Sequence, residues 1–271
     1  MTAALPPLLL IGGGKMGAAM LAGWRERGIS QVVVIDPGPD AAALAADNIT
    51  VIPSLAALDP GFAPRAVILA VKPQVAPDVI PGLARFAGTA LFVSIMAGKT
   101  IAFLAGHLGP AAAIVRAMPN TPAAIRQGIT VACAAGTVTP DQHALAQTLL
   151  GAVGAVEFVT AESLLDAVTA VSGGGPAYVF LLTELLETAA IEQGIPPDLA
   201  RRLARQTVIG SASLLAAGDD PPATLRRAVT SPKGTTERAL AVLMDPDAWP
   251  AAMSRAIEAA TARSRELGET G

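Results

Sequence analysis

The chain has 271 residues, enough for one large domain or two domains of ordinary size. Its formal net charge is -3 and only 15% of its residues are charged, so it lacks the basic surface with which nucleic-acid-binding proteins neutralise phosphates. Hydrophobic residues make up 52% of the chain and aromatic residues only 3%, so its apolar content is mainly aliphatic.

The apolar content does not by itself predict a membrane protein. The longest uncharged stretch, 167–183, contains Ser-Gly-Gly-Gly-Pro at 172–176. We expect these residues to interrupt a helix well before it reaches the roughly 20 apolar residues of a membrane span. The apolar run Leu5 to Ile11 lacks the flanking features of a signal peptide, so we interpret it as the first β-strand.

The composition predicts neither a disulfide nor a metal site. Cys133 is the single cysteine, and neither His107 nor His143 has neighbours at the spacing of metal ligands. Cys133 lies within an apolar run, so we predict that it is buried in a strand. So few cysteines are typical of the reducing cytoplasm, which we predict as the location of the protein.

Short apolar runs alternate with helical patterns over the first 160 residues. We predict strands at 8–12, 32–36, 66–71, 89–95, 113–117, 129–134 and 155–159. The helical patterns between them cover 15–27, 40–46, 74–85 and 141–149. This alternation, with strands that are apolar on both faces, predicts an α/β fold with a doubly wound parallel sheet of the Rossmann type.

The strand patterns stop after Glu162, and the rest of the chain is predicted to be helical. We expect helices at 162–171, 176–193, 197–217, 222–229, 235–244 and 247–267. The second of these has so little polar surface that we expect a second copy of the chain to cover it. We therefore predict a dinucleotide-binding domain over residues 1–160 and a helical dimerisation and substrate-binding domain over 161–271.

A glycine-rich motif follows the first predicted strand and opens the first predicted helix. Gly12, Gly14 and Gly17 fit the pattern G-x-G-x-x-G. In this context the first glycine allows a tight turn, the second lets a pyrophosphate approach the backbone, and the third lets the helix pack closely. The helix N-terminus, with Lys15 and Met16, is expected to face the phosphates. The motif therefore predicts NADH or NADPH binding.

Asp36 ends the second predicted strand, where a carboxylate accepts hydrogen bonds from the ribose hydroxyls of NADH and repels the 2′-phosphate of NADPH. No arginine lies nearby in the sequence to offset this repulsion. Asp36 therefore favours NADH over NADPH, unless the following Pro37-Gly38-Pro39 turns its side chain away.

Three further loops follow predicted strands and should border the cofactor, because ligands of open α/β sheets lie beyond the carboxyl ends of the strands. Two of them contain Ala70, Val71, Lys72 and Pro73, and Ala97 and Gly98. Lys72 is either a proton donor or a surface charge beside the phosphates. In the third loop, Asn120 is interpreted as a partner of the nicotinamide, as a partner of a neighbouring loop, or as a turn residue.

Two loops in the helical half, 172–178 and 230–236, have unusual sequences for simple connections. The second leads directly into a predicted helix, so its backbone N–H groups and the helix dipole can hold an anion such as a carboxylate. It also presents the hydroxyls of Ser231, Thr235 and Thr236, whereas a simple helix cap needs only one.

Six segments together resemble the pyrroline-5-carboxylate reductase family in order and spacing: 11–20, 70–74, 94–98, 116–122, 171–180 and 229–240. The resemblance implies an N-terminal Rossmann domain and a helical domain that interlocks with a second subunit, often in a ring of dimers. It also implies hydride transfer from NADH or NADPH to C5 of the cyclic imine Δ1-pyrroline-5-carboxylate, which gives L-proline.

The resemblance further implies the roles of individual residues. The hydroxyl of Thr236 would meet the imine nitrogen, and the proton would come from Thr236 or from water. The substrate-binding residues would be Ser231, Gly234, Thr235, Thr236, Glu162 and Asp219, with the backbone N–H groups of 234–236 on the substrate carboxylate.

The chain departs from the family pattern at two positions, and rival functions remain open. Gly174 stands where the family usually has serine, and Lys233 where it usually has glycine. Lys233 either adds a positive charge for the substrate carboxylate or marks a backbone that no longer needs a glycine conformation. The rivals are a β-hydroxyacid dehydrogenase, another imine reductase and a non-catalytic dinucleotide sensor. The first typically needs a lysine on a helix of the second half.

Overall fold

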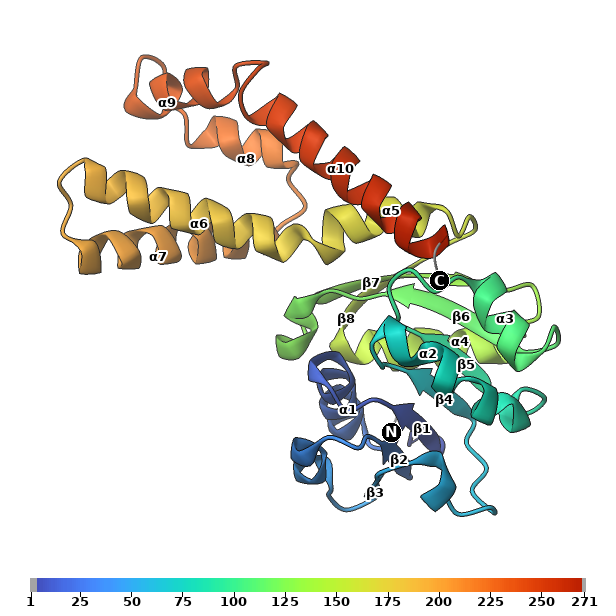
Figure 1. The fold of residues 1–271 in the computed structure, drawn as a ribbon. Helices are drawn as coiled ribbons and strands as arrows, with labels where there is room; N and C mark the ends of the chain where they lie inside the picture. Colours follow the sequence, from blue (N-terminus) through green and yellow to red (C-terminus); the bar gives the residue numbers. More distant parts are fainter. Residues whose placement is uncertain (1–3, 270–271) are drawn as a thin grey trace. The chain divides into compact units, whose positions relative to one another are not determined.

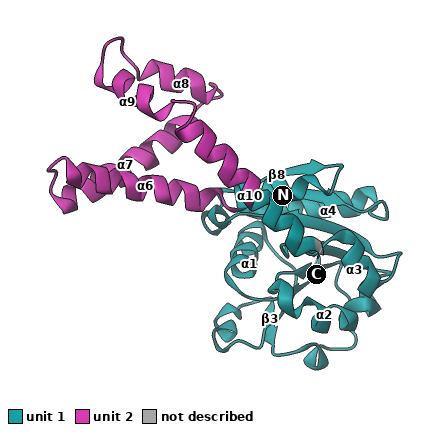
Figure 2. Ribbon diagram, turned by 45° about the horizontal axis from the view of Figure 1, so that its top comes forward, with its two compact units in different colours: residues 1–173, 260–271 teal, residues 174–259 magenta. Residues whose placement is uncertain are grey.

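The computed structural model describes residues 4–269, which divide into two compact units (Figure 2). The first unit contains the chain up to Gly173 and again from Ala260 onward, and the second unit contains residues 174–259. The chain therefore leaves the first unit at Gly173, later in the sequence than the predicted domain boundary at residue 160.

The first unit is built on one sheet of eight strands in the order β3-β2-β1-β4-β5-β6-β7-β8 (Figure 1). All neighbours are parallel except β6 and β7, so the predicted Rossmann-type sheet is confirmed, although the antiparallel pair was not predicted. The strands are β1 (Leu8–Ile11), β2 (Val32–Ile35), β3 (Ile49–Ile52), β4 (Ala66–Leu69), β5 (Leu91–Ser94), β6 (Ala113–Met118), β7 (Gly128–Ala134) and β8 (Gly154–Val159).

The central strands are apolar along their whole length because helices and loops cover both faces of the sheet. Every residue of β1, β2, β4 and β5 is buried, and the two faces contribute to separate hydrophobic clusters. One cluster contains Trp24, whose indole Nε1 donates a hydrogen bond of 2.9 Å to the carbonyl of Leu149. The other contains the fully buried Phe92.

The helices of the first unit differ from prediction in three places. Its α-helices are α1 (Lys15–Arg27), α2 (Ala76–Val79), α3 (Ile101–Leu108), α4 (Pro140–Leu150) and α5 (Leu164–Val168). The predicted helix 40–46 is a 3₁₀ helix at Pro39–Leu44, and the predicted helix 74–85 is divided into short helical turns. Pro81 begins the last of these turns, and it removes a backbone donor from any continuous helix. Helix α3 was not predicted.

The second unit is helical, as predicted. It contains α6 (Gly175–Glu192), α7 (Pro197–Ala216), α8 (Pro222–Ala228), α9 (Thr235–Leu243) and the first part of α10 (Trp249–Glu269). Each begins within two residues of its predicted start, because proline or glycine marks most of the boundaries.

The expectation that glycines interrupt the helical run near residue 173 is wrong. A π-helical turn at Thr169–Gly173 joins α5 to α6, and there the Ser172 hydroxyl donates a hydrogen bond of 3.1 Å to the Val168 carbonyl. By length and composition alone, the resulting run of 29 residues, Leu164–Glu192, is apolar enough to cross a membrane. Only 11% of its most apolar window is buried, so this helix leaves a large apolar surface to be covered.

Candidate active site

The glycine-rich turn lies between β1 and α1, and close packing requires its glycines. Gly12 has a φ of 99°, and a Cβ atom there would lie 2.7 Å from the Ala70 carbonyl oxygen. A Cβ on Gly17 would overlap the carbonyl oxygen of Gly12. By contrast, a Cβ on Gly14, the N-cap residue of α1, would meet nothing within 4 Å, and no side chain caps the helix. Open space in front of an uncapped helix N-terminus fits a pyrophosphate, which the amides near Lys15 can hold.

The Asp36 carboxylate points toward the glycine-rich turn and not away from it. One oxygen accepts a hydrogen bond of 2.6 Å from the Gly13 N–H, and the other accepts one of 2.7 Å from the Gly38 N–H. Gly38 therefore holds Asp36 in place and does not turn it outward. A carboxylate at this point lies beside the dinucleotide turn, where the ribose of a bound cofactor is expected.

The loops after β4 and β5 lie at the same edge of the sheet as the glycine-rich turn, because these strands are parallel to β1. Ala70 contacts Gly12 directly, whereas Lys72 is exposed and precedes a 3₁₀ helix at Pro73–Val75. In the second loop Ala97 is exposed and Gly98 is buried. This edge includes the position between β1 and β4 where the strand order reverses, the usual place of a dinucleotide.

Asn120 holds a neighbouring strand in place. Its Oδ1 accepts a hydrogen bond of 2.9 Å from the Ile129 N–H, near the start of β7. The bond bridges the turn that reverses the chain between β6 and β7. The carbonyl oxygen of this side chain thus already accepts one hydrogen bond, and its NH₂ group is the donor available for a contact with a nicotinamide.

Glu162 forms a buried network with a residue that sequence reasoning missed. Its Oε1 accepts a hydrogen bond of 2.9 Å from Arg116 of β6 and one of 2.8 Å from the backbone N–H of Ile101. The Arg116 side chain is only 7% exposed and that of Glu162 is 28% exposed. The sequence contained a signal for this pair: Arg116 is a basic residue in an otherwise apolar strand, and a buried arginine requires an acidic partner.

Cys133 is buried in β7, as predicted. Burial raises the pKa of its thiol, and the negative charge of Glu162 adds to this effect while Arg116 opposes it. The thiol is therefore protonated at neutral pH, which makes it a poor nucleophile.

The loop 230–236 belongs to the second unit and leads into α9, whose N-cap is Gly234. The Gly234 N–H donates a hydrogen bond of 3.0 Å to the Ser231 carbonyl, so this amide is already bonded. The N-cap residue of α9 is a glycine and has no side chain with which to cap the helix, and the amides of the first turn, including those of Thr235 and Thr236, have no acceptor within the helix. These amides can bind an anion.

Lys233 adopts a left-handed backbone conformation, with a φ of 61°. The explanation that lysine marks a backbone without a glycine conformation is therefore wrong. Its N–H donates a hydrogen bond of 2.9 Å to the Glu237 carboxylate, which helps to hold the strained residue. Left-handed backbone costs a non-glycine residue about 1–2 kcal/mol.

The remaining predicted residue, Asp219, is exposed in the turn between α7 and α8 of the second unit. Glu162 belongs to the first unit, so the structure describes these two acidic residues in separate units. Among the described residues, no group of three or more His, Cys, Asp or Glu side chains could hold a metal ion.

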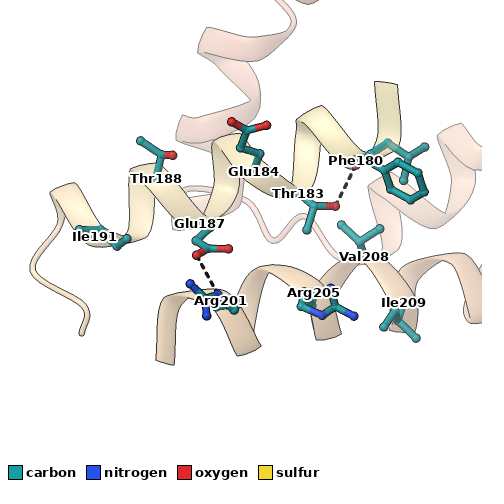
Figure 3. Close-up of a pocket in the computed structure, with 11 residues that line it drawn as sticks. Phe180, Thr183, Glu184, Glu187, Thr188, Ile191, Arg201, Arg205, Val208 and Ile209 are labelled. Atoms are coloured by element: carbon teal, nitrogen blue, oxygen red, sulfur yellow. Dashed lines mark hydrogen bonds and ion pairs between the residues drawn. The ribbon is translucent and has the colours of Figure 1, made fainter. Parts of the chain in front are cut away.

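A groove between α6 and α7 of the second unit contains none of the predicted site residues (Figure 3). It has a volume of about 550 Å³, and an ion pair of 3.2 Å between Glu187 and Arg201 lies within it. Phe180 and Ile209 are largely exposed at this groove. Its apolar lining is typical of a surface that another protein covers.

Comparisons with known proteins match both parts of the chain. Residues 162–267 match the family model for pyrroline-5-carboxylate reductase dimerisation, and residues 8–98 match the model for NADP oxidoreductase, coenzyme F420-dependent. The pyrroline-5-carboxylate reductase of Pseudomonas aeruginosa is 38% identical over 267 residues, which cover 97% of each chain. The chain belongs to the pyrroline-5-carboxylate reductase family.

Solved structures of pyrroline-5-carboxylate reductases have the same fold. The enzyme from Coxiella burnetii has a TM-score of 0.88 and 34% identity, covering 97% of this chain and 98% of that one. The Plasmodium falciparum enzyme, solved with NADP bound, has a TM-score of 0.83 and 27% identity, covering 98% and 99%.

Family membership explains the exposed apolar surface of the helical unit. The dimerisation model covers nearly all of α5 to α10, including the run Leu164–Glu192. In a homodimer, a second copy of the chain is therefore the partner that covers this surface.

Proposed function

We propose that this reductase prefers NADH and that Thr236 acts on the imine nitrogen of the substrate. The reaction follows from family membership: the chain is an NAD(P)H-dependent oxidoreductase that reduces Δ1-pyrroline-5-carboxylate to L-proline in proline biosynthesis. The observation that supports the cofactor preference is the position of Asp36, whose carboxylate is held against the glycine-rich turn at 2.6 Å from the Gly13 nitrogen.

The first unit would hold the dinucleotide. The amides of Lys15, Met16 and Gly17 would bind its pyrophosphate, and Asp36 would accept hydrogen bonds from its ribose. The backbone of the loops after β4 and β5 would border its nicotinamide, as would the free amide group of Asn120. When bound, the reduced nicotinamide supplies the hydride for the reaction. The protein otherwise needs only to position the substrate and polarise its C=N bond.

The loop before α9 would hold the substrate. The amides of Thr235 and Thr236 would bind its carboxylate at the positive end of the helix, with the Ser231 hydroxyl as a further donor. The Gly234 amide would instead keep its bond to the Ser231 carbonyl. The Thr236 hydroxyl would donate a hydrogen bond to the imine nitrogen, which makes C5 more electrophilic. By the family resemblance, Asp219 would be an acidic residue near the substrate, and the proton that completes the new amine would come from Thr236 or from water.

The test is oxidation of NADH and of NADPH by the purified protein, with Δ1-pyrroline-5-carboxylate supplied and L-proline identified as the product. We expect turnover with both cofactors and a higher kcat/KM with NADH. If the protein binds a dinucleotide but forms no proline, the proposed reaction is wrong. A higher kcat/KM with NADPH would contradict the proposed role of Asp36 but not the proposed reaction.

Lys233 allows a separate prediction about the substrate loop. Lys233→Gly removes the left-handed strain but adds chain entropy to the unfolded state, so we expect a net stabilisation of about 0.5–1 kcal/mol. Lys233→Met keeps the strain and removes the charge, so we expect unchanged stability and a KM for the anionic substrate raised a few-fold. Thermal unfolding and steady-state kinetics of both variants measure the two effects. An unchanged KM in Lys233→Met would show that the ammonium group does not attract the substrate.

A further inference from the structure

We propose that Glu162, together with Arg116, is a positioning residue for the cofactor and not a ligand of the substrate. The pair holds the loop after β5, which contains Ala97 and Gly98, in a fixed place at the edge of the sheet. This inference rests on the proposed function, in which that loop borders the nicotinamide.

The carboxylate of Glu162 connects three elements of the first unit. A single oxygen, Oε1, accepts from the Arg116 guanidinium in β6 and from the Ile101 N–H that begins α3. Ile101 also packs against the small hydrophobic cluster that contains Leu165 of α5 and Val131 of β7. The start of α3 is thus attached to two strands and to α5 through polar and apolar contacts together.

The attachment point lies immediately after the proposed cofactor loop. Thr100 caps α3 by accepting a hydrogen bond of 3.0 Å from the Phe103 N–H, while Glu162 takes the N–H of Ile101. Lys99 is also buried, with its ammonium 4.3 Å from the centre of the Phe103 ring. A carboxylate at a helix N-terminus is favourable because the amides there carry partial positive charge. Glu162 therefore fixes the end of a short loop whose other end is fixed by β5.

The C-terminal part of the chain packs against the same loop. A Cβ on Gly98 would lie 3.1 Å from the Leu267 carbonyl oxygen, so α10 approaches the loop backbone closely. The Ser264 hydroxyl donates a hydrogen bond of 2.8 Å to the Asp166 carboxylate and so attaches this end of α10 to α5. The loop is thus held in place from two directions. This matters for hydride transfer, because a displacement of the reacting groups by about 1 Å slows a reaction strongly.

The charge of the pair also argues for a positioning role. Arg116 neutralises Glu162 at 2.9 Å, and both side chains are mostly buried. A carboxylate that is already paired with arginine attracts a cationic group of the substrate only weakly. Breaking the pair would leave a buried arginine without a compensating negative charge.

The test compares two substitutions of Glu162 with a matched control. Glu162→Ala removes both hydrogen bonds, whereas Glu162→Gln keeps an oxygen that can accept them. The control, Glu26→Ala, removes another Arg–Glu pair of the same unit, in which Arg126 lies 2.6 Å from Glu26 and lowers the pKa of its carboxyl. The readouts are the Kd for NADH without substrate, the KM for Δ1-pyrroline-5-carboxylate and the thermal unfolding midpoint.

We expect Glu162→Ala to raise the Kd for NADH about tenfold and to leave the substrate KM within twofold of the wild type. Glu162→Gln should recover the Kd to within about threefold, and Glu26→Ala should not change it. If Glu162→Ala does not fold, Arg116→Lys provides the same test, because one ammonium group holds the carboxylate less rigidly than a guanidinium.

Two results would overturn the inference: a raised substrate KM with an unchanged Kd for NADH, which would make Glu162 a substrate ligand, or a lowered unfolding midpoint with both constants unchanged. The Kd is measured without substrate. It therefore tests the pair even if the wild-type protein fails to reduce Δ1-pyrroline-5-carboxylate, the result that would contradict the proposed function.

Discussion

Replacing Thr236 with alanine is expected to lower kcat about a hundredfold, while the Kd for NADH stays within twofold of the wild type. In the proposed mechanism, the negative charge that develops on the imine nitrogen loses its hydrogen-bond donor, whereas the proposed dinucleotide contacts lie in the other unit of the chain. Stopped-flow measurement of NADH oxidation and a separate NADH titration give the two quantities.

Thr236→Ser is the matched control, because it keeps the hydroxyl at the same position of α9 and removes only a methyl group. It should recover kcat to within about fivefold of the wild type. Undiminished turnover in Thr236→Ala would remove this hydroxyl from the mechanism. An equal loss in both variants would show that the methyl group, and hence packing, is what matters.

Replacing Asp36 with serine is expected to shift the ratio of kcat/KM for NADH to that for NADPH by about thirtyfold toward NADPH. Two negative charges a few ångströms apart at a partly exposed site repel each other by about 2 kcal/mol, which corresponds to that factor. Serine removes the charge and leaves room for the 2′-phosphate beside the Gly13 amide. In the wild type, this amide donates a hydrogen bond of 2.6 Å to Asp36.

Asp36→Asn separates the charge from the hydrogen bonds, because its side-chain oxygen can still accept from Gly13 or Gly38. If repulsion sets the preference, Asp36→Asn should move the ratio most of the way that Asp36→Ser does. An unchanged ratio in both variants would place the ribose elsewhere. A loss of binding for both cofactors in Asp36→Ser alone would show that Asp36 mainly maintains the shape of the glycine-rich turn.

The elements that sequence patterns missed are short or depend on contacts outside their own segment. Strand β3 lies at the edge of the sheet, and only Ile49 of its four residues is buried, so it lacks the apolar run that marks the central strands. Helix α3 is eight residues long and follows its capping Thr100 without a charged first turn. The antiparallel β7 was recognisable in principle, because residues 119–127 are too few for the crossover of about a dozen residues that a parallel pair requires.

The sequence alone determined the fold class and the cofactor class, because glycine spacing, strand patterns and helix boundaries marked by proline are local signals. The family followed from the resemblance of six segments to a known family. The tertiary structure alone decided how individual side chains are used. The Asp36 carboxylate accepts a hydrogen bond from the Gly13 N–H, which lies 23 residues earlier in the chain. Glu162 is joined to Arg116 and Ile101, which are far from it along the chain. Such partners depend on how the chain returns to the same point in space, and no local pattern records that.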